Sequence, residues 1–64
     1  MTVRLVIREL LRDGWVLDRQ EATSHRQFRH PTKPGTVTVA GKLSAELPAG
    51  TLASIRRQSG CRLR

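Results

Sequence analysis

Apolar and polar residues recur along this chain with two different periods, and these predict where helices and strands form. Between Val3 and Asp13 the apolar residues return every three or four positions, which is typical of an amphipathic helix. The arc expected to be buried consists of Val3, Val6, Ile7, Leu10 and Leu11. Leu5 is the one apolar residue outside this arc. Thr2 can cap the start of the helix, and Gly14 suits its end.

Three short segments follow the period of two that is typical of β-strands, and we place them at residues 15–20, 25–30 and 36–40. In the first strand, alternation assigns one face to Trp15, Leu17 and Arg19 and the opposite face to Val16, Asp18 and Gln20. Residues 21–24 form a polar turn without glycine or asparagine, which favours a four-residue loop over a tight two-residue hairpin.

A second helix is predicted at residues 48–59, in which Leu52 and Ile55 form a short apolar stripe. Gly60 is a natural end for this helix. The last three residues, Arg62–Arg64, are interpreted as a basic tail.

The predicted elements follow the order α-β-β-β-α in one domain spanning residues 1–64. Three antiparallel strands joined by hairpins can bury one face under two helices and leave the other face open. We therefore expect an α+β fold, in which a three-stranded antiparallel sheet carries two helices on one face.

Composition adds a strong positive charge to this picture. Twelve Lys and Arg residues against five Asp and Glu give a net charge of +7, and ten of the twelve are arginine. Arginine binds phosphate in a forked geometry and stacks on bases, so we expect a polyanion or an acidic protein as partner. No apolar run approaches the ~20 residues of a membrane span and no signal-peptide pattern opens the chain, so we expect a cytoplasmic protein without a membrane partner. The single cysteine, Cys61, excludes an internal disulfide and is interpreted as a small buried or half-buried apolar residue and not as a reactive thiol.

Candidate chemistry concentrates in the second strand, which holds both histidines and the only phenylalanine of the chain. Phe28 is the obvious core residue, so alternation places Arg26 and His30 on the packed side or its rim. The open face then carries His25, Gln27 and Arg29. We expect His30 to be structural, because it closes the strand directly before a proline.

A metal site is poorly supported by the histidines. His25 and His30 lie five positions apart, which on a regular strand turns them to opposite faces and separates them by roughly 16 Å at about 3.3 Å per residue. Ser24 points away from the neighbouring His25 for the same reason, so a catalytic dyad is not supported. We expect no metal and no cofactor.

A lone histidine beside arginines suits one reaction. RNA carries its own nucleophile in the 2′-hydroxyl, so one general acid or base and nearby cations are sufficient for cleavage without a metal. His25 could take the 2′-hydroxyl proton or protonate the leaving oxygen. The nearby candidates for phosphate contacts are Arg26, Arg29 and Lys33, of which Arg29 is the best placed by alternation.

The chain resembles the HicA family of toxins from toxin–antitoxin systems. The resemblance is carried by GWVL at 14–17, RQ at 19–20, SHRQFRHP at 24–31 and PAGTLASIRRQSG at 48–60. It covers nearly the whole chain, and these runs together are far more specific than any single motif. One position departs from the family, which usually has glycine directly before the Ser-His pair where this chain has Thr23.

The resemblance implies a fold like that of a double-stranded-RNA-binding domain and the activity of an mRNA-cleaving ribonuclease. It implies that the catalytic histidine is His25. We expect Ser24 and Gln27 to join the cationic residues named above as RNA contacts. The implied partners are single-stranded mRNA as substrate and a HicB-type antitoxin that covers the active face. DNA is then contacted only indirectly, through the antitoxin.

Two other functions fit the residues. The first is a non-catalytic RNA-binding module, which would use the open sheet face and the basic stripe of Arg4, Arg8 and Arg12 on the first helix. The second is a DNA-binding component, which has less support because no helix-turn-helix pair is adjacent in the sequence.

Overall fold

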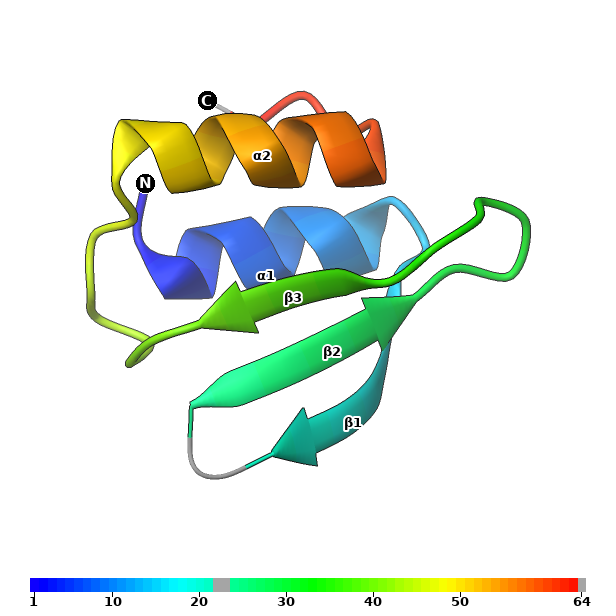
Figure 1. Ribbon diagram of the computed structural model, residues 1–64, viewed down its shortest axis with the longest axis horizontal. Coiled ribbons are helices and arrows are strands. Elements are labelled where there is room, and N and C mark those ends of the chain that lie inside the picture. Colours follow the sequence, from blue (N-terminus) through cyan, green and yellow to red (C-terminus); the bar gives the residue numbers. More distant parts are fainter. Residues whose placement is uncertain (22–23, 64) are drawn as a thin grey trace.

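The computed structural model describes residues 1–21 and 24–63, and it has two layers (Figure 1). The elements in chain order are α1 (Val3–Arg12), β1 (Val16–Glu21), β2 (His25–Arg29), β3 (Val37–Ala40) and α2 (Ala49–Ser59). The strands form one antiparallel sheet in the order β1-β2-β3. This confirms the α+β class, the element order and each predicted boundary to within one residue. The predicted likeness to a double-stranded-RNA-binding domain stays a prediction.

Helix α1 forms where the apolar period predicted it. Its first turn is capped by Thr2, whose Oγ1 accepts the Leu5 N–H at 3.3 Å. Val3, Val6 and Leu10 are fully buried under the sheet, whereas Leu11 is 53% exposed. The prediction that Leu11 belongs to the buried arc is therefore wrong. Successive helix residues are about 100° apart, so Leu11 lies to one side of the line of three buried residues and beyond the cover of the sheet.

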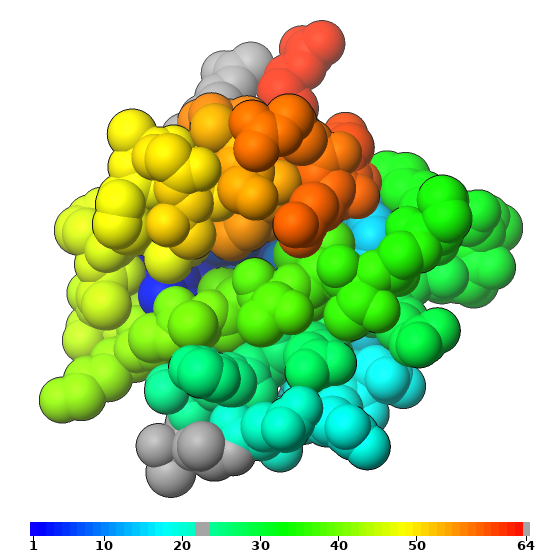
Figure 2. Space-filling view, in the orientation of Figure 1, coloured from blue at the N-terminus to red at the C-terminus, as the bar shows by residue number. Residues whose placement is uncertain are grey.

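The core lies between the two helices and one face of the sheet. Its largest fully buried side chains are Trp15 and Phe28. Around them are Val37 and Val39 from β3, the three buried residues of α1, and Leu52 and Ile55 from α2. Figure 2 shows how closely the layers meet, since little of α1 is visible between α2 and β3 from this side. Trp15 is thus a core anchor, as the sequence predicted.

The chain after α2 returns to the core instead of leaving as a tail. Leu63 is 3% exposed and belongs to the core cluster. Its backbone oxygen accepts a hydrogen bond from Nε of Arg56 at 2.9 Å. The interpretation of residues 62–64 as a basic tail is therefore wrong for Leu63, because an apolar side chain two residues beyond Cys61 can reach the core. Residue 64 lies outside the described part of the chain.

His30 joins the end of α1 to the turn after β2. Its Nδ1 accepts the backbone N–H groups of Thr32 and Lys33, each at 3.1 Å. The ring proton must then sit on Nε2, which donates to the Asp13 carbonyl at 2.7 Å. The ring also meets Trp15 edge-on, with centroids 5.2 Å apart. His30 is structural, as expected.

Strand β1 contains a β-bulge that changes which of its residues share a face. Leu17 pairs with Phe28, but the next paired residue is Arg19, opposite Gln27, so Asp18 is an extra residue in the ladder. The prediction that Leu17 and Arg19 share a face is therefore wrong. Cross-strand partners lie on the same face, so Arg19 and Glu21 accompany Gln27 and His25 on the open side.

Candidate functional site

The open face of the sheet is the side that neither helix covers. The register assigns to it Val16, Arg19 and Glu21 of β1, His25, Gln27 and Arg29 of β2, and Thr38 and Ala40 of β3. The bulge residue, Asp18, also reaches this side, because its Oδ2 lies 3.4 Å from Nε of Arg29. The face is accordingly polar and carries both signs of charge around an exposed imidazole.

His25 is the first residue of the central strand, and its two chain neighbours are anchored to Gly41. The Ser24 carbonyl accepts the Gly41 N–H at 3.0 Å, and the Arg26 guanidinium donates to the Gly41 carbonyl at 3.0 Å. Gly41 has a φ of +111°, which other residues rarely adopt, and a Cβ there would lie 3.5 Å from Cγ2 of Val3. The backbone around His25 is therefore fixed while its side chain stays exposed.

A carboxylate lies directly across the ladder from His25. Glu21 is its partner in the β1–β2 register, and opposite residues of an antiparallel pair have Cβ atoms about 4.5–5.5 Å apart. Nε2 of Gln27 donates to Oε1 of Glu21 at 2.9 Å, and NH1 of Arg19 lies 3.8 Å from the same oxygen. Sequence reasoning missed this residue because it placed Glu21 in the turn instead of in the strand.

Two arginines lie on the same face as the imidazole, both toward the other end of β2. The side chains of Arg19 and Arg29 are each 67% exposed, and each is loosely paired with an acidic neighbour, Glu21 and Asp18 respectively. Exposed ion pairs of this kind contribute little stability, typically about 0–1 kcal/mol, so a phosphate can compete for the guanidinium groups. Regular alternation assigned Arg19 to the same face as Leu17. The bulge at Asp18 places Arg19 on the open face instead.

The predicted RNA contacts divide into those near His25 and those elsewhere. Gln27 and Arg29 share its face, and Ser24 precedes it in the chain. Arg26 points to the packed side, as predicted, with its guanidinium on Gly41. Thr23, the position that departs from the family pattern, lies outside the described residues.

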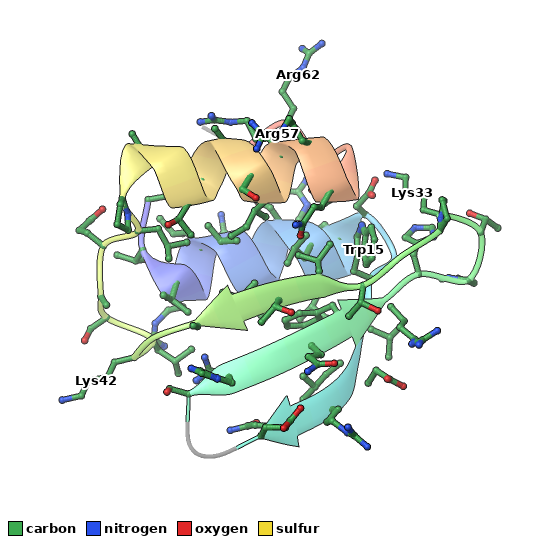
Figure 3. The ribbon with its side chains drawn as sticks, viewed as in Figure 1. Trp15, Lys33, Lys42, Arg57 and Arg62 are labelled. Atoms are coloured by element: carbon green, nitrogen blue, oxygen red, sulfur yellow. The ribbon has the colours of Figure 1, made fainter. Side chains whose placement is uncertain are left out.

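Lys33 lies beyond the opposite end of β2 from His25. Figure 3 shows it at one end of the sheet, with Lys42 at the other end, where β2 begins. Its ammonium group donates to the Asp13 carboxylate and, at 3.1 Å, to the carbonyl of Ser59 at the end of α2. The hydrogen bond from Lys33 is the largest cause of the lowered pKa of Asp13. Lys33 therefore links α1, α2 and the β2–β3 turn.

Comparison with known families identifies the chain. The family model described as HicA toxin of bacterial toxin-antitoxin matches residues 3–61 of the 64. The chain belongs to the HicA family. It is thus a toxin of a toxin–antitoxin system, and a HicA toxin has an antitoxin as its general partner. A search of curated proteins gave no match.

The candidate site of this HicA chain consists of side chains from two strands. Among the described residues, no group of three or more His, Cys, Asp or Glu side chains is arranged to hold a metal ion. None of the helices in the described ranges is long and apolar enough to cross a bilayer. The groups that can do chemistry on the open face are the imidazole, the carboxylate opposite it and the guanidinium groups of Arg19 and Arg29.

Proposed function

We propose that this HicA toxin is a metal-independent endoribonuclease that cleaves single-stranded mRNA in the cytoplasm, with His25 as a proton-transfer group. A HicB-type antitoxin holds it inactive by covering the open face. DNA is contacted only through that antitoxin. The observation that supports the proposal most is the exposed imidazole on the uncovered sheet face, which also carries Arg19 and Arg29.

The chemistry needs little beyond these groups. The 2′-oxygen of RNA attacks the adjacent phosphorus, and the P–O5′ bond breaks to give a 2′,3′-cyclic phosphate and a 5′-hydroxyl. Proton transfer by a positioned side chain contributes typically about 10²–10⁴-fold to such a reaction. Cations aimed at the phosphorane oxygens stabilise the charge that develops there. Arg19 and Arg29 supply those cations, and Gln27 offers an amide to the RNA.

The charge of the chain supports the proposed partners. A net charge of +7 attracts both RNA and an acidic protein surface. An antitoxin that lays carboxylates over Arg19 and Arg29 would satisfy the guanidinium groups and exclude phosphate from the imidazole.

The test is cleavage of a fluorescent single-stranded RNA in EDTA by the purified protein, followed by analysis of the product ends. We expect cleavage that leaves a 2′,3′-cyclic phosphate, and a loss of at least about 100-fold in His25→Ala. Arg57→Ala is the matched control, because Arg57 lies on the side of α2 away from the sheet (Figure 3). Cleavage by His25→Ala at the rate of the control, with both variants folded by circular dichroism, would refute the proposal.

A non-catalytic RNA-binding module is the second candidate. It is favoured by the exposure of Arg8 and Arg12 on α1, whose side chains are 66% and 72% exposed. In that case the wild type binds RNA in a strongly salt-dependent way and leaves it intact. Arg8→Ala and Arg12→Ala then weaken binding, whereas His25→Ala does not.

A further inference from the structure

RNA cleavage by the 2′-hydroxyl requires two proton transfers, one from the attacking oxygen and one to the leaving oxygen. A single imidazole can carry out only one of these two proton transfers at a time. The following inference rests on the proposed function and concerns the group that carries the second transfer.

Five side chains of the chain carry a carboxylate, and all five are described. Glu9 lies on α1, Glu46 binds the N-terminal amine at 3.1 Å, and Asp13 binds Lys33. Asp18 lies further along the sheet from His25, with its Oδ2 3.4 Å from Nε of Arg29. Glu21 remains, and it is the one that the ladder places opposite His25.

The neighbours of Glu21 hold its carboxylate in place without burying it. Gln27 donates to Oε1 at 2.9 Å and Arg19 lies 3.8 Å from the same atom, while the side chain is 56% exposed. Both contacts come from residues of the same sheet face and both fall on Oε1. A carboxylate that is oriented on one oxygen and open to solvent is suited to receive a proton from a bound substrate.

We propose that Glu21 is the general base of the reaction and His25 the general acid. At neutral pH a carboxylate can accept a proton but has none to donate, whereas an imidazole can carry one. Glu21 takes the proton of the 2′-hydroxyl as that oxygen bonds to phosphorus. The P–O5′ bond breaks, and His25 gives its proton to O5′. Exchange with water then restores both groups.

A substrate with an activated leaving group separates the two roles. In uridine 3′-(4-nitrophenyl phosphate) the 2′-hydroxyl still attacks, but 4-nitrophenolate leaves without needing a proton. We expect Glu21→Gln to lower kcat/KM at least about 100-fold on both RNA and this ester. We expect His25→Ala to lower kcat/KM by as much on RNA and by less than about tenfold on the ester. Glu46→Gln, the same chemical change away from the open face, keeps both activities.

The outcomes are distinguishable. A wild type that binds RNA and cleaves neither substrate overturns the proposed function, and the inference with it. A wild type that cleaves RNA together with an equally active Glu21→Gln overturns the inference alone. An ester activity that survives in Glu21→Gln but is lost in His25→Ala also overturns it, because the roles are then reversed. If the melting temperatures of all variants lie within a few degrees of that of the wild type, the losses of activity are due to the chemical step and not to unfolding.

Discussion

Substitution of Leu63 tests the packing of the core directly, because this buried residue lies in a segment whose sequence is typical of a basic tail. It is 3% exposed and packs in the core cluster. Replacing a buried leucine by alanine costs about 2–5 kcal/mol, and a site close to the end of a chain can relax, so we expect roughly 2.5 kcal/mol for Leu63→Ala. For a domain of this size, that corresponds to a fall in Tm on the order of 15 °C.

The matched control is Leu11→Ala. It is the same substitution at a position that is 53% exposed, and we expect it to cost less than about 1 kcal/mol. Thermal unfolding followed by circular dichroism or calorimetry measures both variants. The hydrogen bond from Arg56 to the backbone oxygen of residue 63 persists in Leu63→Ala, so the difference reports side-chain packing. Equal shifts in the two variants would show that Leu63 does not belong to the core.

Three further predictions concern two glycines, the Asp13–Lys33 ion pair and the single cysteine. Gly14 has a φ of +103°, and a Cβ there would lie 2.9 Å from Nε2 of His30, so we expect Gly14→Ala to destabilise by about 2 kcal/mol or more. A Cβ at Gly50 meets no neighbouring atom, and Gly50→Ala should instead gain up to about 1 kcal/mol; equal denaturant midpoints would contradict both. The hydrogen bond from Lys33 lowers the pKa of Asp13, so the Asp13 contribution to stability is present at neutral pH and is lost as the pH falls below about 4. The free-energy difference between the wild type and Asp13→Asn should therefore shrink in that range, and a constant difference would rule out the linkage. Burial raises the pKa of the Cys61 thiol, so its alkylation at pH 8 should be slower than that of a cysteine in an unfolded peptide, and equal rates would contradict this.

The order of elements follows from local features of the sequence. The apolar period of α1, the capping hydroxyl of Thr2 and the position of Gly60 after α2 act over a few residues, so the sequence contains all that is needed. Leu63 could not be placed in this way. It is a single apolar side chain among arginines beyond the end of a helix, and only the packed position of α2 shows that it reaches the core.

The candidate site was predictable in its central strand and not in its edge strand. Phe28 fixed the orientation of β2, so His25, Gln27 and Arg29 were correctly expected on the open side. In β1 no glycine or proline marks the bulge, so regular alternation assigned Arg19 to the wrong face. Lys33 was expected near RNA because of its charge, but its contacts with α1 and α2 depend on the tertiary fold.

Because of the bulge at Asp18, a change in the length of β1 at this position does not have to change the face on which its other residues lie. In a regular strand, the loss or gain of one residue exchanges the faces of everything beyond it. Because Asp18 is the unpaired residue of the ladder, removing it restores regular alternation with Leu17 still opposite Phe28 and Arg19 still opposite Gln27. A deletion at this position therefore leaves Glu21 across from His25. The edge strand can thus tolerate a change in chain length at this position without displacing the carboxylate from the imidazole.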